Sequence, residues 1–222
     1  MDKPRSHTRT TPLTRDDVVA AAVSLADRDG AAGLTMRALA AELGVKAMSL
    51  YHHLAGKEAV LDALVDVVFA EMDAPRPGRP WRAEVRRRCL SARAVLLRHP
   101  WALGLLDTRT SPGPASLAHH DAMLGTLRGD GFDAARTGLA YAMIDAYVYG
   151  FVMQEIALPF EGGGDAADVA EGLVAALADG RYPHLVEFVT DQAMRPDYAF
   201  GAHFEPGLDL LLDTLDKRVR GG

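Results

Sequence analysis

The sequence predicts an all-α protein, and three observations lead to this prediction. Apolar residues recur at three- and four-residue spacing along most of the chain. Helix-capping residues, glycines and prolines stand at the ends of these segments. No segment shows the sustained apolar/polar alternation that is typical of a half-buried strand. We therefore expect a three-helix head at the N-terminus, followed by a larger helical domain.

Length and composition indicate an ordinary globular protein. The chain has 222 residues, of which 49% are hydrophobic and 24% charged, enough for one large or two small domains. No run approaches the ~20 apolar residues of a membrane span, and residues 1–13 lack the apolar region of a signal peptide. The single cysteine, Cys89, excludes an internal disulfide and favours a small buried side chain. A cytoplasmic location without membrane contact is expected.

The net charge of −6 is distributed unevenly along the chain. Residues 1–57 contain eight lysines and arginines against six acidic residues, so this part is +2 and the remainder is −8. A weakly basic N-terminal part on an acidic body is compatible with a nucleic-acid partner at that end.

The first helix begins at a recognisable cap. Thr14 followed by Asp17 forms a capping-box pattern, and the helix should run to about Asp29, where Gly30 and Gly33 break it. Residues 1–13 before it are interpreted as a disordered arm. The head, residues 14–57, is followed by a connecting helix at residues 58–74 and by a proline-rich linker at residues 75–80.

Residues 35–57 predict a helix-turn-helix. Thr35 is a suitable N-cap, and Gly44 supplies the left-handed position that ends the first of the two helices. The second helix should begin near Lys46 and bury Leu50 and Leu54. Its other face carries Lys46, Ala47, Met48, Ser49, His52 and His53. A short helix with such a face is suited to the major groove, where base edges carry a full donor and acceptor code.

Residues 34–61 resemble the DNA-binding domain of the tetracycline-repressor (TetR) family of regulators, most clearly in the run Ser49-Leu50-Tyr51-x-His53-Leu54-x-x-Lys57. By that resemblance, four residues lie where base contacts are usual: Arg37, Ala47, Met48 and His52. Five lie where phosphate contacts are usual: Thr35, Ser49, Tyr51, His53 and Lys57. The partner implied is a double-stranded DNA operator.

Each of these residues also has a simpler interpretation. Tyr51 could pack its ring partly into the head, and Ala47 and Met48 could be ordinary packing residues. His52 and His53 could be surface histidines, and a metal pair is disfavoured because neighbouring helical residues point about 100° apart.

The rest of the chain, residues 81–220, is expected to form a ligand-binding and dimerisation domain. Helices are predicted near residues 81–98, 101–106, 115–129, 133–158, 168–177, 182–194 and 205–219. The arginines of the first of these should lie largely on its solvated side. The run Phe204-Glu205-x-Gly207-Leu208 resembles the closing helix of the family, which implies a homodimer through helices 133–158 and 205–219.

A small-molecule effector is implied by the same resemblance. The candidate contact residues are Trp101, Asp107, His120, Met123, Tyr141, Asp145, Tyr149 and Gln154, although any one of them could be ordinary core. Asp145 lies on an apolar helix face and needs a partner, either an effector group or a neighbouring arginine. Positions that bind the metal in the tetracycline repressor itself fall near Asp107 and Gln154, which depart from its residues. We therefore expect neither magnesium-tetracycline nor any other metal or cofactor.

These features favour a homodimeric repressor that a small molecule releases from a palindromic operator. A constitutive DNA-binding dimer without effector is the alternative. A helical small-molecule enzyme is disfavoured, because the sequence has no Walker loop, GxSxG, HExxH, paired-cysteine metal site or dinucleotide fingerprint.

Overall fold

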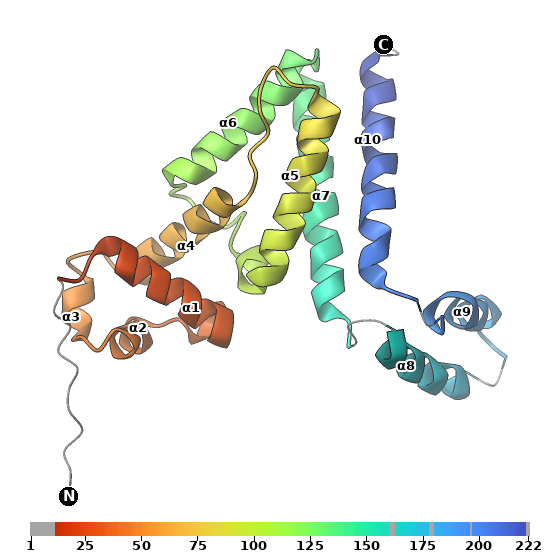
Figure 1. Ribbon diagram of the computed structural model, residues 1–222, viewed down its shortest axis with the longest axis horizontal. Helices are drawn as coiled ribbons and strands as arrows, with labels where there is room; N and C mark the ends of the chain where they lie inside the picture. The colour runs from red at the N-terminus through yellow and green to blue at the C-terminus, as the bar shows by residue number, and fades with distance from the viewer. Residues whose placement is uncertain (1–11, 160–162, 178–179, 196, 221–222) are drawn as a thin grey trace, which may run out of the picture. The chain divides into compact units, whose positions relative to one another are not determined.

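A computed structural model describes residues 12–159, 163–177, 180–195 and 197–220, and all regular secondary structure in these ranges is helical (Figure 1). The predicted all-α fold is confirmed. None of the described helices is long and apolar enough to cross a membrane. Most of the predicted N-terminal arm lies outside the described residues.

The chain forms two compact units that do not follow chain order. The first contains the residues up to Met72 together with Arg98–His119. The second contains Asp73–Leu97 and the residues from His120 onward. Residues 98–119 therefore pack with the head, and each unit has its own buried core.

The first unit contains α1 (Arg15–Gly33), α2 (Met36–Glu42), α3 (Ala47–Leu50), α4 (Lys57–Glu71), the short 3-10 helix η1 (Pro100–Gly104) and the start of α6 (Pro114–Gly129). The predicted capping box at Thr14 and Asp17 begins α1, and Gly30 kinks it with a φ of 70°. Its core includes Val18, Ala22 and Leu39, which are fully buried.

Three acidic residues of α4, spaced four positions apart, hold the segment after η1 and the start of α6 against α4. Arg109 Nη1 lies 2.8 Å from Glu58 Oε2 and 3.6 Å from Asp62 Oδ1. The backbone N–H of Ser116 donates to Asp66 Oδ1 at 2.9 Å. Because side chains at this spacing share one helix face, α4 is fixed along its length to residues 98–119.

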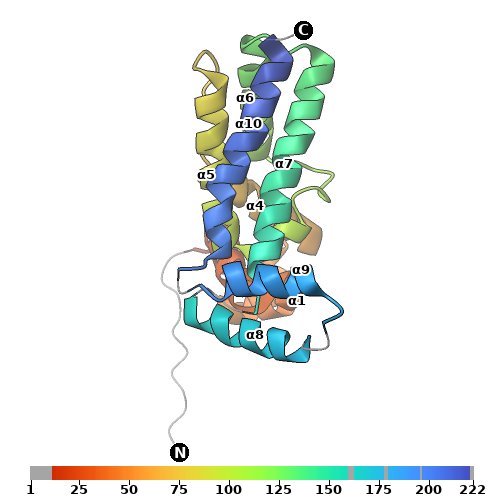
Figure 2. The ribbon, with the colours of Figure 1, turned by 90° about the vertical axis from the view of Figure 1, so that its right-hand side faces the viewer.

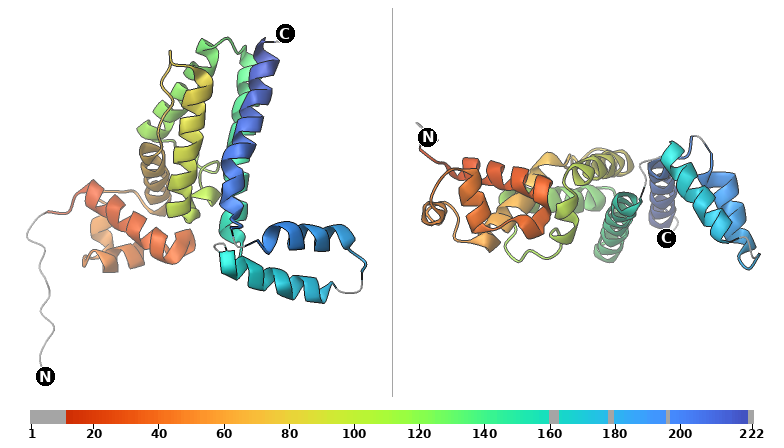
Figure 3. Two further views of the ribbon diagram at one scale, coloured as in Figure 1. Left: turned by 45° about the vertical axis from the view of Figure 1, so that its right-hand side comes forward. Right: turned by 90° about the horizontal axis from the view of Figure 1, so that it is seen from below.

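The second unit contains α5 (Trp81–Arg98, up to Leu97), the rest of α6, α7 (Ala134–Ala157), α8 (Gly163–Ala176), α9 (Pro183–Phe188) and α10 (Phe204–Arg220), with short helical turns at Val189–Ala193 and Phe200–His203. Figures 1 and 2 show α5, α7 and α10 running side by side. Figure 3 shows α8 and α9 next to each other near the end where α7 finishes and α10 begins.

The prediction that the α5 arginines lie largely in solvent is wrong. Arg88 is 0% exposed, and its guanidinium lies 2.6 Å from Asp145 Oδ1 of α7. Arg86 pairs with Asp209 of α10 at 3.1 Å. Guanidinium groups can be buried where carboxylates compensate their charge, and these ion pairs join α5 to its neighbours.

Candidate DNA-binding surface and effector residues

The helix-turn-helix forms as its local signals predict. The Thr35 hydroxyl oxygen accepts from the backbone N–H of Ala38 at 3.1 Å and caps α2. Gly44 has a φ of 66°, the left-handed conformation that glycine adopts at low cost. The second helix is shorter than predicted, since α3 ends at Leu50 and only turns follow. Leu50 and Leu54 are nevertheless both buried, so the α3 segment keeps the predicted orientation.

The opposite side of the α3 segment is exposed. Met48 is 74% exposed and Tyr51 48% exposed. Within this chain, therefore, Met48 does not pack in the core as its simpler interpretation supposed, and Tyr51 is only partly covered. The other predicted DNA contacts are exposed (Thr35, Arg37, Lys46, Ala47, His52, Lys57) or half-buried (Ser49, His53).

Three cations lie on or beside this surface, namely Arg37, Lys46 and Lys57. Among the residues that the structure describes, none forms an ion pair with Arg37, Lys46 or Lys57. Arg28 in the same unit instead pairs with Glu42 at 3.0 Å. Unpaired cations next to a short exposed helix are available to the phosphates of a nucleic acid.

Gly56 positions the last of these cations. Its φ of 142° allows the chain to turn directly into α4, of which Lys57 is the first residue. The backbone N–H groups of a first helical turn have no partner within the helix, and they favour an anion at that place. A Cβ added to Gly56 would lie 4.0 Å from the Tyr51 ring, so this turn also brings Tyr51 close to the start of α4.

The eight candidate effector residues are divided between the two units. Trp101 and Asp107 belong to the first unit, and the other six belong to the second. In the first unit, Trp101 Nε1 donates to Asp27 Oδ1 at 2.6 Å, and Asp107 is exposed.

Two polar pairs involve the candidates of the second unit. His120 of α6 hydrogen-bonds to the Tyr141 hydroxyl of α7, and Asp145 pairs with Arg88. The partner of Asp145 is thus a neighbouring arginine, which is one of the two alternatives that the sequence left open. Met123 is fully buried, Tyr149 half-buried and Gln154 exposed.

Arg88 is a residue of this unit that sequence reasoning missed. A signal for its burial exists, because positions 85, 88 and 92 share one helical face and both Val85 and Ala92 are buried. The sequence interpretation gave more weight to the charge of Arg88 than to its position on the buried face of the helix. Its partner, Asp145, is 57 positions away in the chain. Three of the candidates, Asp145, Tyr141 and Tyr149, interact electrostatically with the buried Arg88 guanidinium.

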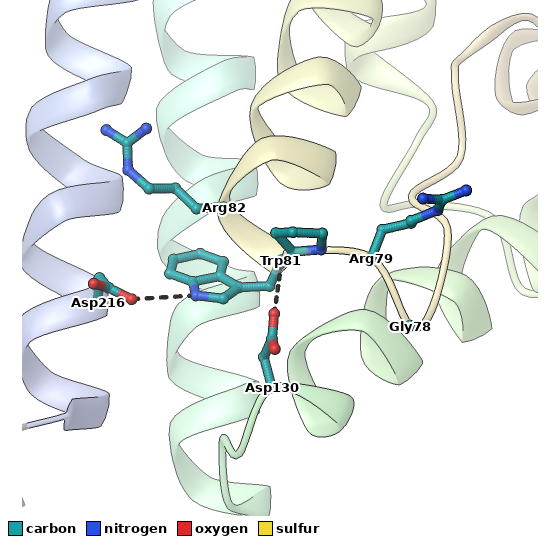
Figure 4. A pocket seen from close by; sticks show the side chains of 7 residues that line it. Gly78, Arg79, Trp81, Arg82, Asp130 and Asp216 are labelled. Atoms are coloured by element: carbon teal, nitrogen blue, oxygen red, sulfur yellow. Dashed lines mark hydrogen bonds between the residues drawn. The ribbon is translucent and has the colours of Figure 1, made fainter.

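A cleft of about 550 Å3 lies at the N-terminal end of α5, and none of the predicted effector residues lines it. Figure 4 shows how Trp81 is held there. Its backbone N–H donates to Asp130 at 2.5 Å, and its indole Nε1 donates to Asp216 at 3.4 Å. The other lining residues are Gly78, Arg79, Pro80 and Arg82. These contacts fix the beginning of α5 to α10 and to the turn before α7.

Comparison with known families matches both parts of the chain. Residues 18–64 match the family described as bacterial regulatory proteins, tetR family. Residues 74–219 match the family described as tetracyclin repressor-like, C-terminal domain. The second match alone covers more than half of the chain.

Several curated relatives are regulators. An HTH-type transcriptional regulator of Saccharopolyspora erythraea is 38% identical over 95% of this chain and 88% of its own length. The HTH-type transcriptional repressor DrrR1 of Streptomyces coeruleorubidus is 36% identical over 93% of this chain and 78% of its own. A class A tetracycline repressor of Escherichia coli is 31% identical over 94% and 93%.

Solved structures with this fold include ActR of Streptomyces coelicolor in complex with actinorhodin, at a TM-score of 0.76 and 26% identity, covering 94% of this chain and 99% of that one. The class A tetracycline repressor in complex with 5a,6-anhydrotetracycline and magnesium has a TM-score of 0.62 at 28% identity, covering 92% and 99%. The chain therefore belongs to the tetracycline-repressor family and is a ligand-responsive, DNA-binding transcriptional repressor that acts as a homodimer.

Proposed function

We propose that each protomer places α3 in the major groove of one half-site of a palindromic operator. The observation that carries this proposal is the α3 surface, where exposed Met48 lies among cations with no carboxylate partner in the described part of the chain. One helix in one groove reads few base pairs, and a two-fold dimer reads two half-sites about one helical turn apart.

The side chains divide by chemistry into base and phosphate contacts. Arg37 and His52 donate hydrogen bonds to base edges, and Ala47 and Met48 contact thymine methyl groups. The phosphate contacts are Thr35, Lys46, Ser49, Tyr51, His53 and Lys57. The Thr35 oxygen already accepts from Ala38, so its hydroxyl proton is the part that reaches a phosphate. Because its DNA partner lies in the cytoplasm, the repressor acts there.

The proposed dimer interface uses the outer faces of α7 and α10. Leu139, Met143 and Met153 of α7 are exposed in the single chain, and Leu210 of α10 is 71% exposed. Ala142 and Ala146 are exposed between them, and small side chains permit the close approach of another helix. Burial of this apolar surface against a second copy removes it from water.

The proposed effector is a small organic molecule that exchanges hydrogen bonds with the polar core of the second unit. His120 and Tyr141 bond to each other, and a ligand hydroxyl or carbonyl group can replace either partner. Asp145 orients Arg88, and Tyr149 is half-buried on the same helix as Asp145. Trp101, Asp107, Met123 and Gln154 remain candidate contacts. We do not propose magnesium-tetracycline, because the resemblance places an acidic metal-binding position of the tetracycline repressor near Gln154, which is exposed and carries a neutral carboxamide.

Release from DNA follows from a population shift. The effector binds one arrangement of the dimer more tightly than the arrangement that spaces two α3 helices for the operator. The largest factor by which the effector can lower operator affinity is the ratio of its affinities for the two arrangements. In each protomer α4 transmits this change to the DNA contacts, since its first residue, Lys57, is itself a proposed DNA contact.

The test is selection of bound duplexes from a random DNA pool by the full-length dimer, followed by competition with fractions of small metabolites. Enrichment of a palindrome that one fraction abolishes is the expected result. A palindrome that resists every fraction would support the constitutive alternative instead. Enrichment of no sequence would contradict the proposed DNA contacts.

A further inference from the structure

His99 is a buried histidine between two carboxylates, and the contacts proposed above do not use it. It is 7% exposed. Its Nδ1 lies 2.6 Å from Asp27 Oδ1 of α1, and its Nε2 lies 3.2 Å from Glu71 Oε2 of α4. All three residues belong to the first compact unit. In the sequence, His99-Pro100 indicated only a break between helices.

Both contacts can be hydrogen bonds only if each ring nitrogen carries a proton. A neutral imidazole has one donor and one acceptor nitrogen, and an ionised carboxylate only accepts. Burial raises the pKa of Glu71, but the hydrogen bonds from Arg98 and His99 outweigh it and leave that pKa below its usual value. Glu71 is therefore an acceptor, and when Asp27 is ionised as well, only an imidazolium can donate to both carboxylates.

Two further side chains complete this group. Arg98 Nη2 lies 2.5 Å from Glu71 Oε2. Trp101 Nε1 donates at 2.6 Å to the same Asp27 oxygen that His99 contacts, and the two rings have centroids 5.7 Å apart. In the described ranges these are the polar partners that the two carboxylates have. We call Asp27, Glu71, Arg98, His99 and Trp101 the His99 clamp.

The clamp joins the two helices that enclose the helix-turn-helix. α1 contributes much of the core of the head. α4 runs for 15 residues from Lys57, a proposed phosphate contact, to Glu71, a member of the clamp. The clamp therefore acts at the end of the same helix whose first residue is a proposed DNA contact.

We propose that His99 is a positioning residue whose protonated imidazole fastens α4 to α1, so that operator affinity depends on proton uptake by the head. This inference rests on the DNA-binding function proposed above. Loss of the proton turns one ring nitrogen's lone pair toward a carboxylate, which removes one of the two hydrogen bonds through which the clamp joins α4 to α1. Affinity for the operator then falls as pH rises through the range in which histidines lose their charge.

The test measures operator affinity by fluorescence anisotropy at about pH 6 and about pH 8, at constant ionic strength. Wild type is compared with His99→Gln, which keeps the polarity but cannot become cationic. A single linked proton changes affinity by at most about tenfold per pH unit. We expect wild-type affinity to fall at least about threefold more than that of His99→Gln over this interval. Parallel profiles would overturn the proposal.

Other histidines also titrate, so a matched control is needed. His52 and His53 are present in both proteins, and their contribution therefore cancels in the comparison. His184→Gln removes a histidine that is 95% exposed and pairs with nearby Glu187. This control should keep the wild-type pH profile.

A second measurement separates this inference from the DNA-binding proposal. The difference in Tm between wild type and His99→Gln, without DNA, should be larger at about pH 6 than at about pH 8. A Tm difference that does not change with pH would contradict the proposed role of His99 even if the protein binds DNA. If no duplex binds at either pH, the DNA-binding proposal fails, but the melting data still test whether protonated His99 joins α4 to α1. Should His99→Gln not fold, Asp27→Asn removes one carboxylate charge and should flatten the same profiles.

Discussion

The α3 surface and the α5 arginines differ in how their charges are satisfied. Arg37, Lys46 and Lys57 have no carboxylate partner in the described part of the chain. Arg82, Arg86, Arg88 and Arg93 each pair with an acidic residue of α7 or α10. Cations without an internal partner remain available to an external polyanion, and paired cations join helices. The three cations near α3 are thus available for the proposed DNA contacts, whereas the four arginines of α5 join the helices of the second unit.

The largest expected effect comes from breaking the buried pair of the second unit. Asp145→Ala leaves the Arg88 charge buried without its carboxylate, and we expect the free energy of unfolding to fall by about 3 kcal/mol. Urea denaturation measures this. Arg136→Ala, which removes an exposed pair with Asp133, should cost less than about 0.5 kcal/mol. Similar losses in both variants would contradict the structural role of Arg88.

Arg37→Ala tests the recognition side of the comparison. Removing a guanidinium that donates to a base edge should weaken discrimination at one operator position by about 1–3 kcal/mol. Competition between the selected operator and duplexes changed at single positions measures this loss. Equal weakening for every duplex would mean that Arg37 contacts phosphate instead.

Lys57→Ala and Arg82→Ala compare the two classes of cation directly. Because Lys57 is present in both protomers, Lys57→Ala removes two phosphate contacts and should reduce the slope of log affinity against log salt by about 1.8, with similar weakening for all operator variants. Arg82 pairs with Asp213 at 2.6 Å, and its replacement should leave the slope unchanged. Equal changes of the slope in both variants would contradict the distinction between unpaired and paired cations.

The smallest expected effect concerns acid stability. Hydrogen bonds from Arg76 and Arg87 lower the pKa of buried Glu84 from 4.5 to about 2. Because the folded pKa is depressed, Glu84 stabilises the fold above the unfolded value, and this contribution is lost as pH falls from about 4.5 toward 2. Glu84→Gln should therefore lose less stability than wild type over this interval, as measured by urea denaturation at several pH values. An unchanged acid profile would show that Glu84 contributes nothing to it.

Local signals predicted the beginnings and ends of the elements that form the head. The capping box at Thr14, the cap at Thr35 and the turn at Gly44 all occur as expected. Each depends on residues within a few positions of one another, so a linear pattern contains the necessary information. The extent of α3 was overestimated because buried Leu50 and Leu54 share a face whether or not the chain between them is regular helix.

Pairs between distant residues escaped prediction. Arg88 finds Asp145 at a separation of 57 positions, and His99 finds Asp27 at a separation of 72. Charge alone favoured solvent for Arg88, because an isolated charge is costly to bury. Nothing near His99 in the sequence indicated its two carboxylate partners. The contacts assigned to the operator and to the effector stay predictions for the same reason, since their partners belong to other molecules.

The sequence by itself determined the helical class, the helix-turn-helix and the family, because periodicity, caps and a compact motif are properties of neighbouring residues. Only the tertiary structure decided which charges are paired, and that residues 98–119 pack with the head rather than with the helices around them in the chain. These features depend on which helix faces meet, and ion pairs form only where packing brings opposite charges within a few ångströms of each other.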